Sequence, residues 1–359
     1  MMQTYTIMDL FAGVGGLSYG FAHRPEFRIL AANEIERDIA IAYSLNHPDV
    51  KMLNCDIADL TEQILTDALQ GETVDIVVGG PPCQSYSTLG KRRMDSRANL
   101  FQEYRRVLEI LHPRAFVFEN VVGILSMDQG RLFQRVQQEF SELGYDLKFQ
   151  ILNAVDYGVP QHRERVILVG MQGENCFVYP QPTHGEEKIP HVTLAQAIGD
   201  LPPLRSGQSS TQYAGEPDNA FLRFVRGNES RTVTEHTAPK NGEHLIRIME
   251  ALQDGQSKDD LPEEIRPKSG YGNTYAKLWW NRPSTTITRN FACPSSSRCI
   301  HPRDSRAMTI REGARLQSFP DSYLFYGSDG MKRLEIGNAV PPLLSLAIAG
   351  QMAQALEEK

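Results

Sequence analysis

The chain of 359 residues has little cysteine and no long apolar run. Its five cysteines are odd in number and form no CxxC pair, which argues against a disulfide framework and against a zinc site. Reduced thiols of this kind are typical of the cytoplasm. Because no run of about 18 apolar residues occurs, we expect no membrane span. The first residues lack a basic region followed by an apolar one, so we expect no signal peptide.

The chain also lacks a positive charge balance. The formal net charge is −7 and the pI about 5.8, which by itself weighs against a nucleic-acid-binding protein. Between residues 282 and 315, however, seven arginines stand with only two acidic residues. A second basic cluster consists of Lys91, Arg92, Arg93 and Arg97. Two such patches could bind a polyanion. For either patch alone, scattered arginines exposed to solvent are an equally good explanation.

The first half of the chain alternates strand-like and helix-like segments. Strands are predicted at 5–10, 27–32, 51–54, 74–78, 115–118, 147–154 and 166–170. Helices are predicted at 17–22, 35–46, 100–111 and 132–143. This alternation indicates an α/β fold with a doubly wound, mostly parallel sheet.

The sequence pattern changes near residue 179, where prolines and polar residues interrupt the alternation of strand-like and helix-like segments. We therefore predict a large domain over 1–185 and a smaller, loop-rich domain over 186–300. Residues 301–359 are predicted to form a hinge and a return to the large domain, ending in an apolar helix.

A stiff turn follows the predicted strand 74–78. Two glycines and two prolines, Gly79 to Pro82, lead into Cys83. In an open α/β sheet, ligands bind at the carboxyl ends of the strands. A thiol at that edge favours a nucleophile, and a small buried cysteine is the alternative.

The first strand leads into a second turn, which is rich in glycine and contains Gly13 and Gly15. A nicotinamide-binding fingerprint would have glycine where Ser18 stands, which disfavours a dehydrogenase. Glu34 lies at the spacing of a carboxylate that binds ribose hydroxyls, and Asp56 follows the third predicted strand. These residues predict a nucleoside-type pocket, with a tight turn and surface acids as the alternative.

Several segments resemble, in order, the signature blocks of the DNA cytosine-5 methyltransferases: Asp9–Gly13, Gly80–Gln84, Glu119–Val121, Gln161–Arg165, Thr309–Leu316 and Gly337–Pro341. The blocks span nearly the whole chain. Only the region from about 186 to 275 has none, and in the family that region is the variable target-recognition domain. The resemblance implies a Rossmann-like methyltransferase of the bacterial restriction-modification type, with a catalytic domain over 1–185 that binds S-adenosylmethionine.

The resemblance also implies a mechanism. Cys83 would add to C6 of a flipped-out cytosine, so that C5 attacks the methyl group of S-adenosylmethionine and S-adenosylhomocysteine is released. Glu119, with a protonated carboxyl, would contact N3 and the exocyclic amine. Arg165 would reach O2, and Arg163 would support the loop or the DNA backbone. Period-two spacing places both arginines on one face. Ordinary ion pairs, for example with Glu164 or Glu119, are the alternative.

For the cofactor pocket the resemblance implies Phe11, Gly13, Gly15, Glu34, Asp56, Ile57, Pro82 and Asn338. Phe11 would line the adenine, and Glu34 would bind the ribose. Many relatives have a large aromatic residue beside the adenine where this chain has Ile35, so this wall of the pocket would be aliphatic. For DNA contact it implies Ser87, Arg92, Arg93, Arg97, Gln161, Thr286, Thr288 and Arg289. Residues 85–99 would close over the flipped DNA. No metal is implied.

The expected partner is double-stranded DNA, and a cognate restriction endonuclease acting on the same site is a second candidate. We expect a cytoplasmic monomer without membrane contact. Two alternatives stay open. Relatives with the same catalytic blocks methylate tRNA, and a silent binding protein could keep the fold. The presence of Cys83, Glu119 and Arg165 disfavours the silent protein.

Overall fold

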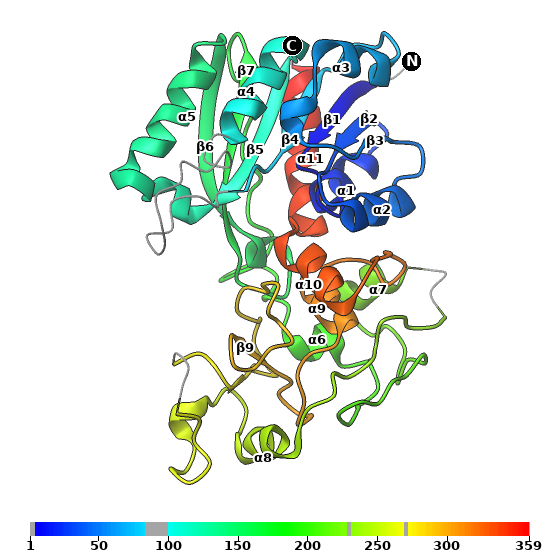
Figure 1. Ribbon diagram of the computed structural model, residues 1–359, viewed down its shortest axis with the longest axis vertical. Coiled ribbons are helices and arrows are strands. Elements are labelled where there is room, and N and C mark those ends of the chain that lie inside the picture. Colours follow the sequence, from blue (N-terminus) through cyan, green and yellow to red (C-terminus); the bar gives the residue numbers. More distant parts are fainter. Residues whose placement is uncertain (1–3, 83–99, 228–230, 269–271, 359) are drawn as a thin grey trace. The chain divides into compact units, whose positions relative to one another are not determined.

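The computed structural model describes residues 4–82, 100–227, 231–268 and 272–358 (Figure 1). The chain divides into two compact units. The first unit comprises residues 1–153, 164–181 and 344–359, and the second comprises 154–163 and 182–343. The second unit thus includes 154–163 and 301–343, which composition had assigned elsewhere. The predicted domain boundaries at 185 and 300 remain predictions.

The first unit is built on a seven-stranded sheet in the order β3-β2-β1-β4-β5-β7-β6. The strands are β1 (Tyr5–Leu10), β2 (Phe27–Asn33), β3 (Lys51–Leu53), β4 (Ile76–Gly79), β5 (Ala115–Val121), β6 (Tyr145–Asn153) and β7 (Glu164–Gln172). The first five strands pair in parallel, and β7 runs antiparallel to both β5 and β6. The predicted α/β fold with a mostly parallel sheet is therefore confirmed.

Helices cover both faces of this sheet, since β1 and β4 are buried along their whole length. The helices are α1 (Gly16–Ala22), α2 (Arg37–Asn46), α3 (Glu62–Leu69), α4 (Leu100–Leu111), α5 (Arg131–Ser141) and α11 (Pro342–Glu357). On one face α3, α4 and α5 share a core with Met8, Val77 and Phe116. The alternation of side chains along β1 turns Asp9 to the other face, where it meets α1.

The C-terminal helix α11 closes the first unit. The Ser345 hydroxyl accepts a hydrogen bond from Gly20 N at 3.0 Å, and Tyr5 donates to Leu356 O at 3.0 Å. A Cβ on Gly20 would lie 2.2 Å from the Ser345 carbonyl carbon, so glycine allows α1 and α11 to approach closely. A helix that is apolar on all sides, as α11 is, fits burial in a core.

By length and composition, the stretch Asp329–Glu357 is the one helical stretch among the described residues that could cross a membrane. It consists of α10 (Asp329–Asn338) and α11. Of its most apolar window, 61% is buried inside the protein. Such burial is typical of core helices, so this stretch is weak evidence for a membrane span.

The second unit contains short helices joined by long loops. The helices are α6 (Leu194–Ile198), α7 (Ala220–Arg226), α8 (Glu243–Ala251), α9 (Ile310–Leu316) and α10. Two short strands, β8 (Ala276–Lys277) and β9 (Arg298–Ile300), pair in parallel. Helix α9 is buried throughout and begins with a capping box between Thr309 and Glu312. The block that contains α9 therefore forms the interior of this unit.

Candidate functional site

In the first unit, the carboxyl ends of β1, β2 and β4 lie level with one another and with Phe118 of β5. Leu10 pairs with both Asn33 and Gly79, and Gly79 pairs with Phe118. The residues that follow these positions therefore meet at one edge of the sheet: Phe11, Glu34, Gly80 and Glu119. This is the edge at which open α/β sheets bind ligands.

The glycine-rich turn after β1 faces open space and is tied to Glu34. Gly13 and Gly15 adopt φ values of 56° and 92°, a left-handed conformation that favours glycine. A Cβ on Gly13 would meet no atom within 4 Å. Gly13 N donates to Glu34 Oε2 at 3.0 Å, and Glu36 N donates to Glu34 Oε1 at 2.9 Å. Burial raises the pKa of Glu34 despite these hydrogen bonds.

Apolar side chains lie beside this turn. Phe11 has a left-handed φ of 54°, a strained conformation for a residue with a side chain. Ile35, which follows Glu34, is 57% exposed. Ile57 is buried, whereas Asp56 is exposed and accepts a hydrogen bond from Ala58 N at 3.0 Å. Exposed apolar surface next to a hydrogen-bonding carboxylate suits a ligand with a planar ring and hydroxyl groups.

A buried carboxyl that sequence reasoning missed lies beneath the turn. Asp9 Oδ2 accepts a hydrogen bond of 2.5 Å from the Ser18 hydroxyl, which also contacts the Tyr43 hydroxyl at 2.8 Å. Burial raises the pKa of Asp9 to about 7, and the charge of Glu34 acts in the same direction. Ser18, which the sequence marked only as a departure from a dehydrogenase fingerprint, is thus the partner of Asp9.

Glu119 and Arg165 form an ion pair at the same edge. Arg165 Nε lies 2.8 Å from Glu119 Oε1, and each side chain is 12% exposed. In the antiparallel register Val121 pairs with Arg165 and Glu119 with Ile167, so the two charged side chains are diagonal neighbours on one face. The ion pair that the sequence left open as an alternative is present. Strand β5 runs on to Val121, so Glu119 lies within the strand and not after it.

The Pro81-Pro82 turn is held against β5. Asn120 Nδ2 donates to Pro81 O at 3.0 Å, and Asn120 Oδ1 accepts from Val121 N at 2.9 Å. A Cβ on Gly80 would lie 2.6 Å from Glu119 Oε2, so the turn approaches Glu119 through a glycine. Pro82 is exposed. The turn that leads into Cys83 is therefore positioned by the strand that carries Glu119.

Arg163 has partners different from those of Arg165. It is 1% exposed and donates to Ile287 O at 2.9 Å and to Gly337 O at 3.0 Å, all within the second unit. Strand β7 begins at Glu164, so Arg163 precedes the strand. Arg163 and Arg165 therefore have separate sets of partners, and their placement on one face remains a prediction. Arg163 holds backbone carbonyls of its own unit.

Gln161 is also interior, which corrects its assignment to DNA contact. Its side chain has no exposed surface. Oε1 accepts from Ile287 N at 2.9 Å, and Nε2 donates to Leu316 O at 2.6 Å and to Gln317 Oε1 at 2.8 Å. With both polar atoms engaged inside the unit, Gln161 positions Ile287 and has no surface for DNA.

We call residues 284–289 the reading segment. Ser284 exchanges backbone hydrogen bonds with Pro160 and His162, and Thr286 Oγ1 donates to His162 O at 2.8 Å. Thr286, Thr288 and Arg289 are exposed. The segment is thus anchored on its inner side while three predicted DNA contacts face outward.

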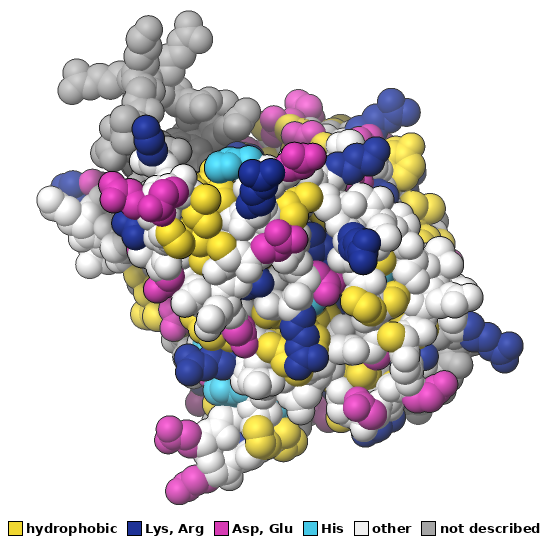
Figure 2. Space-filling model, turned by 90° about the horizontal axis from the view of Figure 1, so that it is seen from below, with side chains coloured by type: hydrophobic (Ala, Val, Ile, Leu, Met, Phe, Trp, Pro, Cys, Tyr) yellow, Lys and Arg dark blue, Asp and Glu magenta, His cyan; other side chains and the backbone are white. Residues whose placement is uncertain are grey.

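The predicted basic patch between residues 282 and 315 is partly internal. Arg306, Arg311 and Arg315 are at most 1% exposed, and each lies within 4 Å of a buried carboxylate. Arg306 pairs with Glu312 at 2.7 Å, for example. On the face shown in Figure 2, basic side chains are scattered among acidic and uncharged ones. Three of the seven arginines therefore stabilise the unit and are not available to a polyanion.

Other predicted site residues fall outside these clusters. Asn338 is the last residue of α10, in the second unit, and is exposed. Cys83, Ser87, Arg92, Arg93 and Arg97 lie outside the described residues. Within the described part of the chain, no group of three or more His, Cys, Asp or Glu side chains is arranged to hold a metal ion.

Comparison with known proteins gives consistent matches along the chain. A family model for C-5 cytosine-specific DNA methylase matches residues 5–354. Type II methyltransferase M1.HphI of Haemophilus parahaemolyticus is 34% identical over 351 residues, which cover 97% of this chain and 86% of that protein. Type II methyltransferase M.DdeI of Desulfomicrobium norvegicum is 36% identical over 376 residues, 97% of this chain and 88% of that protein.

Solved structures support the fold alone. A prophage-encoded protein of Escherichia coli, described as a DNA modification methyltransferase, aligns with a TM-score of 0.80 and 24% identity. The alignment covers 99% of this chain and 100% of that one. A Spodoptera frugiperda DNMT2 variant aligns with a TM-score of 0.62 and 17% identity, again over 99% and 100% of the two chains.

Proposed function

The chain belongs to the C-5 cytosine-specific DNA methylase family, and from this premise we propose how this DNA cytosine-5 methyltransferase works. It transfers a methyl group from S-adenosylmethionine to C5 of a flipped-out cytosine in a specific short duplex sequence, through a covalent bond between Cys83 and C6. The observation that carries the proposal is the arrangement at the sheet edge. There the turn into Cys83 lies directly against the Glu119–Arg165 pair.

Glu119 and Arg165 form the base-binding part of the site. The carboxyl of Glu119 contacts N3 and the exocyclic amine of cytosine, and the guanidinium of Arg165 donates to O2. Their mutual ion pair, and the bond from Arg165 to Glu164 O at 2.7 Å, hold both groups in place before the base arrives. A base within a duplex cannot reach these groups, so the enzyme extrudes it.

Cys83 makes C5 nucleophilic. Its thiolate adds to C6, and the electron pair of the C5–C6 double bond makes C5 enamine-like. C5 then forms a bond to the methyl carbon that S-adenosylmethionine would supply, while the methyl–sulfur bond breaks, its electron pair goes to sulfur, and S-adenosylhomocysteine leaves. Loss of the C5 proton to a base and departure of the thiolate from C6 restore the aromatic ring and the free thiolate.

The residues around the glycine-rich turn fit S-adenosylmethionine, which supplies an electrophilic methyl group when bound. Gly13 faces open space, and both oxygens of Glu34 are already oriented by backbone N–H groups. We propose that Glu34 binds the ribose hydroxyls and that Phe11 and Ile35 line the adenine. Further proposed contacts are Gly13, Gly15, Asp56, Ile57, Pro82 and Asn338.

The substrate side is proposed from sequence and from the relatives. We propose that Ser87, Arg92, Arg93 and Arg97 contact DNA phosphates, and that Thr286, Thr288 and Arg289 contact the duplex. The relatives are named type II methyltransferases, which supports a cognate endonuclease acting on the same site. We propose a monomer that acts in the cytoplasm.

A trapping experiment tests the mechanism. Duplex DNA with 5-fluorocytosine at the target retains its fluorine where the C5 proton normally leaves, so the enzyme should form a stable adduct with it. Wild-type protein and S-adenosylmethionine should give a shifted, denaturation-resistant band, and Cys83→Ser should give none. Cys176→Ser is the matched control. An adduct that persists in Cys83→Ser would show that another nucleophile acts.

A further inference from the structure

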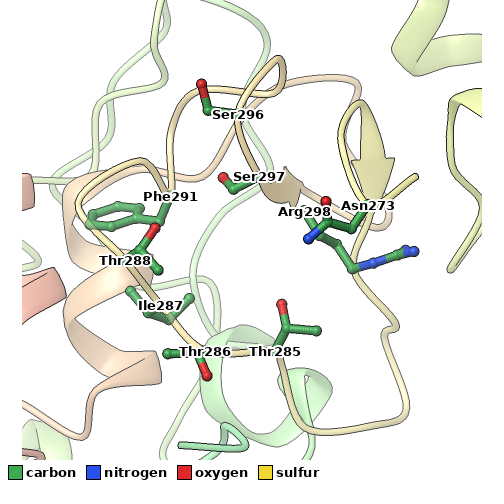
Figure 3. Close-up of a pocket in the computed structure, with 9 residues that line it drawn as sticks. All are labelled: Asn273, Thr285, Thr286, Ile287, Thr288, Phe291, Ser296, Ser297 and Arg298. Atoms are coloured by element: carbon green, nitrogen blue, oxygen red, sulfur yellow. The ribbon is translucent and has the colours of Figure 1, made fainter. Parts of the chain in front are cut away.

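The second unit contains a hollow of about 320 Å³ beside the reading segment (Figure 3). Of the nine lining residues, most carry hydroxyl groups, one carries an amide and one a guanidinium, and none is acidic. Ile287 and Phe291, which are 3% and 2% exposed, supply the apolar part of the wall. A mostly polar, uncharged wall with an apolar part suits a neutral group that both donates and accepts hydrogen bonds.

The wall is rigid on the side of the reading segment. Ile287 is bonded at its N–H by Gln161 and at its carbonyl by Arg163. A Cβ on Gly337 would lie 2.3 Å from Arg289 N, so helix α10 supports the segment at van der Waals distance through a glycine. A site held in this way needs little ordering when a ligand enters.

Two polar side chains in the wall remain available to a ligand. The amide of Asn273 and the hydroxyl of Thr285 point toward the hollow in Figure 3. Both residues are exposed, and neither side chain forms a hydrogen bond with another residue in the described part of the chain. Thr286, by contrast, donates its hydroxyl to His162 O.

The guanidinium in the wall is already engaged. Arg298 donates to Gly255 O at 2.8 Å and also to Lys277 O, and its guanidinium lies 4.3 Å from the centre of the Trp279 ring. Arginine is the usual reader of guanine in the major groove. With Arg298 held by the protein, the free hydrogen-bonding groups at the hollow are an amide and a hydroxyl.

We propose that this hollow reads an A·T base pair of the recognition sequence, with Asn273 and Thr285 as specificity-determining residues. An asparagine amide pairs with N6 and N7 of adenine, and a threonine hydroxyl can donate a hydrogen bond to O4 of thymine. The exposed Arg289 next to the hollow is placed for a phosphate, the contact that sets register on the duplex. The inference rests on the proposed function and names the part of the target that these residues recognise.

The test compares base preference in wild-type enzyme, Asn273→Ala, Asn273→Asp and Thr285→Val. Each protein is expressed in a host without cytosine methylation, and 5-methylcytosine is mapped across the genome. The ratio of kcat/KM is then measured for the wild-type site and for duplexes substituted at each position. Gln253→Ala, which removes an exposed amide away from the hollow, is the control.

We expect the wild-type motif to contain an A·T pair, and the hollow variants to lose roughly 5- to 150-fold of the discrimination at that one position. Gln253→Ala keeps the motif. A wild-type motif without an A·T pair overturns the inference, as do hollow variants with unchanged discrimination. A wild-type protein that methylates no DNA overturns the proposed function itself. Asn273→Asp keeps the size of the side chain but removes its hydrogen-bond donors. A loss of discrimination in this variant therefore reflects base reading and not a loss of folding.

Discussion

Gly80 lies so close to Glu119 that a Cβ on Gly80 would come within 2.6 Å of Glu119 Oε2 and 3.3 Å of the Glu119 carbonyl oxygen. The turn into Cys83 and the strand that carries Glu119 thus meet without an intervening side chain. Asn120, the next residue along β5, holds the same turn through Pro81 O. The sequence blocks that contain Gly80 and Glu119 lie some forty residues apart but are therefore in contact at one site.

The first prediction concerns this contact. Gly80→Ala should displace the carboxyl group of Glu119 and lower kcat at least about tenfold, because small displacements of catalytic groups reduce the rate strongly. S-adenosylhomocysteine should bind as before, since Glu34 and the glycine-rich turn are untouched. Single-turnover methylation and calorimetry measure the two quantities. Gly215→Ala, which places the same methyl group in open space, should change neither. Equal kcat values in Gly80→Ala and Gly215→Ala would contradict a functional contact between Gly80 and Glu119.

The second prediction concerns Glu34, the carboxylate that we propose binds the cofactor. Glu34→Gln keeps the shape of the side chain but removes a charge that accepts two backbone hydrogen bonds. Since hydrogen bonds to charged groups contribute about 1.5–3 kcal/mol, S-adenosylhomocysteine should bind roughly 10- to 150-fold more weakly. Titration calorimetry gives the dissociation constant. Glu36→Gln changes a neighbouring exposed carboxylate and should have little effect; similar losses in both variants would argue against a ribose contact by Glu34.

The third prediction concerns pH and Asp9. Burial raises the pKa of Asp9 to about 7 in the folded protein, above its value of about 4 in an unfolded chain. The folded state therefore holds a proton that the unfolded state loses, and this contribution to stability disappears as pH rises from about 4 to 7. Asp9→Asn should make the unfolding free energy less sensitive to pH, by up to about 1.4 kcal/mol per pH unit in that window.

Urea unfolding of wild type and Asp9→Asn at pH 5, 6 and 7 measures this difference. Glu36→Gln is a suitable control because Glu36 is exposed. Parallel curves of unfolding free energy against pH for wild type and Asp9→Asn would mean that Asp9 is ionised in the folded protein.

The fourth prediction concerns Gln161 as a positioning residue. Gln161→Ala leaves Ile287 N and Leu316 O without their partner, which should lower the unfolding free energy by roughly 1–3 kcal/mol. The reading segment loses an anchor, so DNA should bind several-fold more weakly while S-adenosylhomocysteine binds normally.

Fluorescence anisotropy with duplex DNA, at several salt concentrations, distinguishes the two possible roles. A residue that contacts phosphate lowers the slope of affinity against salt, whereas a positioning residue leaves that slope unchanged. His162→Ala alters the exposed neighbour and serves as the control. A reduced salt slope in Gln161→Ala would restore Gln161 as a DNA contact.

Local sequence patterns were sufficient for the sheet of the first unit. Strand β1 runs over Tyr5–Leu10, as predicted, because an apolar run bounded by a glycine turn specifies a buried strand by itself. Helix α4 also has its predicted bounds, since its apolar face recurs with the helical period. Helix α3 was missed: it is short and buries only Leu65 and Leu69, so its periodic signal is weak.

The sequence by itself determined the family, the mostly parallel α/β sheet and the order of its blocks, because these depend on residue type and local spacing. Only the tertiary structure decided which polar residues are buried and which are exposed. In the sequence, Gln161 and Arg315 look like polar residues of a binding surface, yet both are buried and bind partners inside their own unit. A buried polar group needs partners, and some of those partners come from segments more than a hundred residues away, as Ile287 and Asp200 do. No local pattern carries that information.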